Sequence, residues 1–510
     1  MRRSPLAIGI AEPAGISLLA LLVGIWILGS MAASHAAPGD AEQPTDNEPI
    51  QLELTPAADG VPPAPALPLA PLAETLPAPE ASPAPLLDPL DFEALVQAEV
   101  RRQLAATRRA AYTPATDTAP PKGLKLYDAK QTGGFPFSAN IDGFMQVRWF
   151  EFARGATGYQ NAAGQFEPIS NINSFNINRF MITPYGYVVD ERIIWSLTLF
   201  GTTDNGKNDA IVPLGVVGWK FNDNLSITGG TTFVASTREW IISNRWMQGV
   251  DRSMANTFFR PSYSPGVEAN GTLSDGRLIY RAGIWNSIQG ATSGVLRKGT
   301  SMAWAGNVWW EPNGPFGLGY SDMEYHDDPV WRIGTSGLTA RTEAIDSAGE
   351  NPEDTIVRLS DGTPIALPNV LGAGSTVNEF DLSLATIDAG WKYRGIALNF
   401  EYYFRLIDNL TGVGTFDRSS LYDQGGQAYV AWCVVPRTYE WYGRSSAVTG
   451  PFGTGQEYGG GFNWYWFGSR QSRFTFEALH ILRSPADNIL YPYRAGYTGT
   501  AIQTQLCLIF

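Results

Sequence analysis

The sequence predicts an all-β protein, a transmembrane antiparallel up-and-down β-barrel of about 16 strands, with about 18 as the alternative, preceded by an N-terminal Pro-rich arm and a short helix. Two observations carry this prediction. Apolar and polar residues alternate along many segments beyond residue 135, which is the period of a strand with one apolar and one polar face. The chain also holds 54 Gly, 16 Trp and 21 Tyr, yet its mean hydropathy is −0.12, because the polar face of each strand cancels the apolar one.

Residues 1–36 are expected to be a secretory signal peptide. Arg2 and Arg3 give a positive start, residues 16–28 form an apolar run of 13 residues, and small residues stand before position 37. A helix that spans a membrane needs about 20 apolar residues, so this run is too short for an anchor. We therefore expect the rest of the chain to be exported.

Residues 37–90 are dominated by Pro and Ala, as in VPPAPALPLAPLAETLPAPEASPAP. Such a composition cannot bury enough surface to fold, and it favours extended polyproline geometry. Residues 37–111 carry twelve acids against four Arg, so −8 of the total charge of −13 belongs to this part. The arm is either a periplasmic tether or a tail without a partner. The chain has no basic stripe, which excludes a nucleic-acid partner.

Residues 91–111 are predicted to form a short amphipathic helix, because apolar side chains recur at helical spacing and acids precede arginines. The apolar positions are Phe92, Leu95, Val96, Val100 and Leu104. This helix stands alone or forms the stub of a coiled coil, although it holds fewer than about three heptads. Residues 112–135, which include Pro114, Pro120 and Pro121, are expected to be a linker.

Residues 136–510 are predicted to form the barrel. Near its start Met145 and Val147 are apolar, whereas Gln146 and Arg148 are polar, and later segments repeat the alternation. At about 22 to 24 residues for each strand with its turn, these 375 residues make about 16 strands. A ring of that size is wide enough to leave an aqueous channel rather than a filled interior.

Two further features of this part bear on a membrane location. The closing run AIQTQLCLIF alternates in the same way and stops at Phe510, like the C-terminal strand by which the barrel assembly machinery recognises outer-membrane proteins. Aromatic pairs such as Trp309 and Trp310, or Trp441 and Tyr442, fall near the ends of the alternating runs, where the aromatic girdles of barrels lie. A soluble sandwich with one buried face shows the same alternation and is the competing fold.

Two local features complete the fold prediction. Residues 334–378 are polar and rich in turn formers, so they are predicted to be a long surface loop. Cys433 and Cys507 are too few for a disulfide framework. They form either one bridge or two unpaired thiols, and we favour the thiols.

The sequence contains few residues in patterns that indicate catalysis or metal binding. His326 precedes Asp327 and Asp328 in a predicted loop, and His480 lies near a predicted strand end. A solvated turn and an interfacial position explain them without chemistry. The sequence also lacks cysteine pairs with metal spacing, a phosphate-binding Gly-rich loop and a GxSxG motif. We expect no enzymatic activity, no cofactor and no metal.

Four segments, in order, resemble the phosphate-selective porin family (porin O and P type), whose members are trimeric outer-membrane channels. They are FNINRFMITPYGYVV (175–189), GGTTFVASTREW (229–240), FFRPSYSPGVEANGTLSDGRLIYRAGIWN (258–286) and YRGIALNFEYYFR (393–405). The resemblance implies a barrel of about 16 strands, three copies per assembly, and a third loop folded into each pore. That family draws phosphate through an arginine ladder and a lysine cluster. This chain departs from the pattern, because it has seven Lys and none between Lys220 and Lys298.

The segment 238–266 is the expected constriction, where fixed charge would act most strongly on a passing solute. Its charged residues, four Arg against two acids, are Arg238, Glu239, Arg245, Asp251, Arg252 and Arg260. Strand parity directs a second set toward the lumen wall: Arg148, Arg277, Arg281, Glu401, Arg405 and Arg473. The arginines hold anions by charge-assisted hydrogen bonds, or they pair with local acids or bind lipopolysaccharide phosphates from extracellular loops.

These inferences predict an outer-membrane porin of a diderm bacterium, with its N-terminal arm in the periplasm. It would allow passive diffusion of small hydrophilic solutes, with a weak preference for anions and, through the resemblance, for phosphate. The expected partners are outer-membrane lipid, the barrel assembly machinery, small solutes and further copies of the chain in a homotrimer. The competing functions are a secreted all-β carbohydrate-binding protein and an outer-membrane barrel hydrolase.

Overall fold

The structure is a computed structural model, which describes residues 123–510 except 133, 204–211, 289–301, 346–354 and 489–491. The signal peptide (1–36), the Pro-rich arm (37–90) and the short helix (91–111) expected from the sequence lie outside the described residues. Within the described part, no helix has the length and apolar character needed to cross a membrane.

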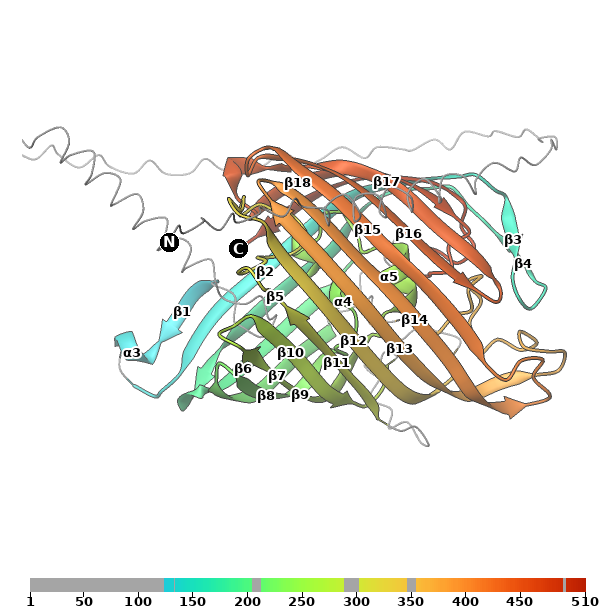
Figure 1. Cartoon of the computed structure of the whole chain (residues 1–510), viewed down its shortest axis with the longest axis horizontal. Helices are drawn as coiled ribbons and strands as arrows, with labels where there is room; N and C mark the ends of the chain where they lie inside the picture. Colours follow the sequence, from blue (N-terminus) through green and yellow to red (C-terminus); the bar gives the residue numbers. More distant parts are fainter. Residues whose placement is uncertain (1–122, 133, 204–211, 289–301, 346–354, 489–491) are drawn as a thin grey trace, which may run out of the picture. The chain divides into compact units, whose positions relative to one another are not determined.

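Sixteen antiparallel strands form one closed ring in the described part of the chain (Figure 1). Each strand pairs with the next one along the chain, and β19 (Gly499–Ile509) pairs with β2 (Ser138–Arg154) to close the ring. Across this seam Val147 lies opposite Leu506. The prediction of an all-β barrel of about 16 strands is confirmed. The competing sandwich is wrong, because the strands form one ring rather than two stacked sheets.

The other strands of the ring follow one another in sequence order. They are β5 (Ile172–Val188), β6 (Asp190–Gly201), β7 (Val212–Asn222), β8 (Leu225–Phe233), β9 (Tyr263–Leu273), β10 (Leu278–Trp285), β11 (Ala303–Trp310), β12 (Val330–Glu343), β13 (Thr376–Tyr393), β14 (Ile396–Val413), β15 (Leu421–Val435), β16 (Tyr439–Gly450), β17 (Gly453–Tyr465) and β18 (Ser472–Leu482). Because sequential antiparallel pairing needs only turns and loops, residues far apart in the chain meet only at the seam and inside the ring.

The ring has two different ends. At the end where β2 begins and β19 stops, which we call the short-turn end, residues 223–224 join β7 to β8 and residues 394–395 join β13 to β14. Arg394 and Gly395 both have positive φ, 44° and 83°. Such a pair fits a type I′ turn, whose twist matches two antiparallel strands. Most connections at the opposite end, which we call the loop end, are longer, although only residues 451–452 join β16 to β17 there. One long connection, residues 311–329 between β11 and β12, lies at the short-turn end.

The stretch 112–135 was expected to be a linker, but its described part contains two short elements. β1 (Leu124–Asp128) pairs with the first residues of β2, and α3 (Ala129–Thr132) follows it. β19 pairs with β2 only from Phe144 onward, so the first residues of β2 would otherwise lack a neighbour on that side. The linker prediction is wrong here, because β1 satisfies that exposed strand edge. A separate hairpin of β3 (Gly158–Gln160) and β4 (Phe166–Pro168) follows β2.

The outer surface of the ring carries an apolar band. In β13, Ile387 is 51% exposed while its neighbours Thr386 and Asp388 are buried, as the alternation of a barrel wall requires. Exposed apolar side chains lie along strands β2, β6–β9 and β11–β15: Met145, Val147, Leu197, Val217, Ile227, Val267, Val308, Ile333, Ile387, Leu406 and Val430.

Exposed aromatic side chains gather toward the two ends of the strands. Those toward the short-turn end are Phe221, Trp310, Trp432, Trp441 and Trp464, and those toward the loop end are Phe175, Trp304 and Tyr422. Only one member of each aromatic pair expected in a girdle faces outward. Trp309 and Tyr442 are buried, because adjacent residues of a strand point to opposite faces.

The interior of the ring is largely filled, which differs from the open aqueous channel expected for a ring of this size. Three segments fold inward: the inner loop (234–262), the β11–β12 segment (311–329) and the described part of the β12–β13 loop (355–375). Apolar side chains of the first and third segments join the wall in one large cluster, which includes Val234, Met254, Phe258, Phe259, Val357, Leu359 and Ile365. Those of the β11–β12 segment pack in two smaller clusters, Tyr320 with Met247 and Tyr429, and Met323 with Cys433 and Tyr465. A ring of about 16 strands encloses more space than its own wall side chains fill, so inserted loops occupy the rest.

The prediction of a surface loop for residues 334–378 is wrong. Both ends of this range belong to strands, and part of its middle is buried. β12 continues to Glu343 and β13 begins at Thr376. Between them, Leu359 and Ile365 are buried within the apolar cluster. The turn formers Ser360, Asp361 and Gly362 lie in a turn, but a loop that folds inward uses the same residue types as a surface loop does.

Both cysteines are free and buried. Cys433 lies on β15 and Cys507 on β19, two strands that are not neighbours in the ring. The unpaired thiols favoured from the sequence are confirmed.

Candidate functional site

The inner loop connects β8 to β9 and lies inside the ring (Figure 1). It holds α4 (Arg238–Ile241), a 3-10 turn η1 (Asn244–Trp246) and α5 (Met254–Phe259). Each helix starts at a hydroxyl residue that accepts a hydrogen bond from the first turn, Thr237 from the Trp240 N–H and Ser253 from the Asn256 N–H. Threonine and serine are favoured at this position, so the local sequence sets where both helices begin.

Glu401 anchors α4 to the wall. Its carboxylate accepts hydrogen bonds from the backbone N–H groups of Arg238 (2.6 Å) and Glu239 (3.1 Å), which the first helical turn leaves without partners. The Arg238 guanidinium donates to Asn399 Oδ1 (2.6 Å) and to the carbonyl oxygen of Ala389 (3.0 Å). These acceptors belong to β13 and β14, so α4 is held against that side of the ring.

Glu239 ties the two helices of the inner loop together. Its carboxylate accepts hydrogen bonds from the N–H (2.8 Å) and the hydroxyl (2.6 Å) of Ser253, and from the hydroxyl of Tyr429 on β15 (3.0 Å). Burial raises the pKa of Glu239, although these donors and the charge of Arg444 oppose the rise. The carboxyl is therefore a buried hydrogen-bond acceptor that joins the inner loop to β15.

Asp251 forms a second anchor. Its carboxylate lies 2.8 Å from Arg148 Nη1 on β2 and 2.7 Å from Arg179 Nη1 on β5. Arg444 of β16 donates to the Asp251 carbonyl oxygen at 2.5 Å. All four residues are buried. Buried charges are tolerated when they are paired, so this cluster joins the inner loop to wall strands on two sides of the ring.

Arg252 stabilises the inner loop through contacts within the loop itself. It donates to the carbonyl oxygens of Glu239 (3.1 Å), Trp240 (3.3 Å) and Ile242 (3.1 Å). Its guanidinium carbon lies 4.6 Å from the Trp240 ring centroid, and that of Arg260 lies 4.0 Å from it. Cation–π contacts of this kind and the three hydrogen bonds hold the loop in one conformation.

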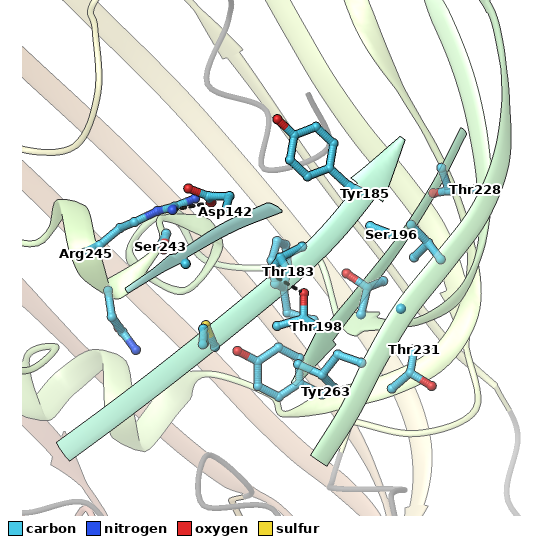
Figure 2. A pocket seen from close by; sticks show the side chains of 18 of the residues that line it. Asp142, Thr183, Tyr185, Ser196, Thr198, Thr228, Thr231, Ser243, Arg245 and Tyr263 are labelled. Carbon is cyan, nitrogen blue, oxygen red and sulfur yellow. Dashed lines mark hydrogen bonds and ion pairs between the residues drawn. The ribbon is translucent and has the colours of Figure 1, made fainter. Parts of the chain in front are cut away.

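A cavity of about 190 Å³ remains between the inner loop and the wall strands β2 and β5–β10. Figure 2 shows Arg245 and Ser243 of the inner loop on one side of it and the hydroxyl residues of β5, β6 and β8 on the other. The hydroxyl-bearing residues of its lining are Thr183, Tyr185, Ser196, Thr198, Thr228, Thr231, Thr232, Ser243 and Tyr263. The Thr183 and Thr198 hydroxyl oxygens lie 2.8 Å apart.

The charged residues of the lining are three Arg and two acids: Asp142, Arg245, Arg252, Glu268 and Arg281. Arg245 forms an ion pair with Asp142. Arg281 forms a two-pronged pair with Glu268, with both nitrogen–oxygen distances at 3.1 Å. Two-pronged pairs are geometrically specific, so these guanidinium groups are held in place on the cavity wall.

Aromatic side chains border one region of the cavity. Phe233, Trp240 and Tyr263 contact one another with ring centroids 5.1 to 6.4 Å apart. Trp240 is 1% exposed, and its indole nitrogen has no hydrogen-bond partner among the described residues. A buried indole N–H usually finds a partner, which makes this donor a candidate contact for a solute.

All six residues expected at a constriction lie in the inner loop, but they play different parts. Arg245 and Arg252 line the cavity. Arg238, Glu239, Asp251 and Arg260 are absent from the described lining, and the first three hold the loop to the wall. Whether the loop forms the narrowest point of a pore stays a prediction.

The residues expected on the lumen wall also divide. Arg148, Arg281, Glu401, Arg405 and Arg473 are buried inside the ring. Arg405 is bound to Asp423 and to the Arg358 carbonyl oxygen, and Arg473 to the Met247 carbonyl oxygen. The prediction that Arg277 faces the lumen is wrong. Arg277 lies exposed in the turn between β9 and β10, because β10 begins only at Leu278. Phe510 is 54% exposed beside Gly143 at the short-turn end.

Sequence reasoning missed the row of hydroxyls. Thr183 and Tyr185 on β5, and Ser196 and Thr198 on β6, share strand parity, so each pair could have been assigned to one face. The predicted lining consisted of charged residues only. Parity alone also does not tell which part of the wall stays uncovered when loops fold inward.

A second cluster, in the β11–β12 segment, has the residue types of a metal site. Ligand atoms of Asp322, Glu324 and His326 lie within 4.8 Å of one another. However, Glu324 is already paired with Arg470 (2.9 Å), and Asp322 accepts from the Gly395 N–H (2.7 Å). Positive partners compete with a cation for the same oxygens, so we assign no metal to this cluster.

The chain shows low similarity to several solved outer-membrane proteins. OmpT of Vibrio cholerae gives a TM-score of 0.45 at 9% identity and covers 73% of this chain and 98% of that one. OprB of Pseudomonas putida gives 0.43 at 9% identity, covering 73% and 94%. The outer-membrane channel DcaP of Acinetobacter baumannii gives 0.39 at 8% identity, covering 73% and 97%. No protein-family model and no characterised protein matches the chain.

Proposed function

We propose that this protein is an outer-membrane channel for passive diffusion of small hydrophilic solutes. The observation that carries the proposal is the polar cavity between the inner loop and strands β2 and β5–β10, inside a ring whose outer face is apolar. A barrel of this kind places a polar path across an apolar layer, and its width and fixed charges select what passes.

The apolar band supports a membrane location, and it leads to a prediction. Ile387→Arg, in the middle of β13, is expected to lower the free energy of unfolding in lipid bilayers by about 2–4 kcal/mol, because an arginine would face the hydrocarbon. Leu273→Arg is the control, since Leu273 is the last residue of β9 and lies beside the turn. There the cost falls to about 0–1 kcal/mol. Urea unfolding in phospholipid vesicles measures both, and equal costs would contradict a membrane-spanning band.

We propose that ion selectivity is weak, with a small preference for anions. The lining carries three Arg against two acids, and Arg245 and Arg281 are each held by a carboxylate. Paired charges leave a smaller net potential in the cavity than unpaired arginines would.

Single-channel recording in planar bilayers tests the function. The purified protein is expected to conduct KCl, and under a tenfold salt gradient the reversal potential should show a modest excess of chloride permeability. Absence of any current would overturn the channel. A reversal potential that favours potassium would overturn the anion preference alone.

Several finer expectations are part of this proposal and stay predictions. They are the phosphate-selective family, the homotrimer, recognition by the assembly machinery and a periplasmic N-terminal arm. Of these, the phosphate preference has the least support from the lining, because the one Lys on the β13 wall, Lys392, contacts Glu324 and Phe316 away from the cavity. Phosphate and chloride permeabilities measured in the same bilayers would separate a general anion preference from a phosphate site.

A further inference from the structure

We propose that the cavity beside the inner loop is a binding site for a neutral, polyhydroxylated solute of monosaccharide size or smaller. This inference rests on the channel function proposed above and names the solute class that the cavity favours.

Hydroxyl groups dominate the polar surface of the cavity. Ser196, Thr228, Thr231 and Ser243 line it, and their hydroxyls have no hydrogen-bond partner within the described part of the chain. Each hydroxyl can donate one hydrogen bond and accept two. The hydroxyl groups of a polyol can also donate and accept. A polyol can therefore form hydrogen bonds with these wall hydroxyls in more than one orientation (Figure 2).

The charged groups at the cavity are already partnered. Asp142 with Arg245 and Glu268 with Arg281 form ion pairs, and Arg252 donates to three carbonyl oxygens of its own loop. An anionic solute would have to compete with a carboxylate for Arg245 or Arg281. A neutral solute meets no such competition and loses less hydration free energy on entering.

One indole N–H donor points to a ligand independently of the hydroxyls. Trp240 lines the cavity, and its indole nitrogen is buried without a partner among the described residues. An indole N–H donates only, so its partner must be an acceptor such as a hydroxyl or ether oxygen. A sugar or polyol carries several of these acceptors.

The volume limits the size of the solute. At about 190 Å³ the cavity is smaller than the roughly 300–1,000 Å³ of pockets that enclose drug-sized ligands. A monosaccharide or a shorter polyol fits this limit, and an oligosaccharide exceeds it.

The test is the block of KCl current by D-glucose, with D-gluconate as the charged probe of the same carbon number. For each protein the fractional block is measured against its own open current over a range of probe concentrations. D-Glucose is expected to reach half-block at a lower concentration than D-gluconate. Lower half-block by gluconate would overturn the neutral-solute assignment.

Two sets of variants locate the site. Thr183→Val/Thr198→Val removes both partners of one hydroxyl pair and keeps their shape, which limits any loss of stability. Ser196→Ala/Thr228→Val removes two hydroxyls that have no partner in the protein. Each double variant is expected to raise the half-blocking glucose concentration by about tenfold, as the loss of two hydrogen bonds implies. Thr339→Val, on the outer face of β12, is the control and should change neither the current nor the block.

The outcomes separate this inference from the channel itself. Normal KCl currents without glucose block, or glucose block that both double variants leave unchanged, would overturn the inference and leave the channel standing. No KCl current from the natural protein would overturn both. Thermal unfolding of each variant verifies that it is folded before its block is compared.

Discussion

Asp251→Ala is expected to destabilise the barrel by about 3–5 kcal/mol and to raise its single-channel conductance several-fold. The carboxylate of Asp251 is buried between Arg148 (2.8 Å) and Arg179 (2.7 Å). Removing it leaves two buried guanidinium groups without their carboxylate, and breaking a buried pair in this way typically costs about 3–5 kcal/mol. The inner loop would also lose its connection to β2 and β5, so it should leave the lumen for part of the time.

Urea unfolding in lipid vesicles and single-channel recording measure the two effects of Asp251→Ala. Glu379→Ala is the matched control, because it removes one carboxylate from a half-exposed pair with Arg341. Exposed pairs contribute about 0–1 kcal/mol, so the control should change stability little and conductance not at all. A destabilised variant with unchanged conductance would show that the contacts of Glu239 and Glu401 are sufficient to hold the loop.

Arg245→Glu is expected to turn the channel from weakly anion-preferring to cation-selective. The natural lining holds three Arg and two acids, so the variant holds two Arg and three acids. In addition Asp142 would lose its ion pair and face the new carboxylate across the cavity. Fixed charge in a narrow low-dielectric site changes the local concentration of counter-ions by about tenfold or more, and the permeability ratio of potassium to chloride should rise by a similar factor.

The reversal potential under a salt gradient measures this change. Arg341→Glu introduces the same charge on the outward side of β12, away from the cavity, and serves as the control. Its reversal potential should match that of the natural protein. If both variants shift the reversal potential equally, the cavity beside Arg245 is not the path of the ions.

Sequence patterns predicted the wall of this protein well. The alternation of Met145, Gln146, Val147 and Arg148 assigns outward and inward faces, and the structure has the same assignment. This signal is local, because strand parity depends only on the pleat of the strand.

The error at Arg277 has the same local origin. Its parity with Arg281 is correct only while the strand continues, and β10 begins one residue later, at Leu278. Strand boundaries depend on where the turn forms. The side chain of Arg277 is therefore exposed in the turn, whereas Arg281 is buried and paired with Glu268 inside the ring.

The amino-acid sequence by itself determined the class of fold and the faces of its strands. These follow from neighbours a few residues apart, where pleat geometry and capping leave little choice. Only the tertiary structure decided which side of the lumen remains open. Glu401 and Asp251 lie 150 residues apart in the chain, and their contacts with the inner loop determine which wall hydroxyls are left uncovered. Such long-range pairing leaves no periodic signal in the sequence, because it depends on the closure of the whole ring.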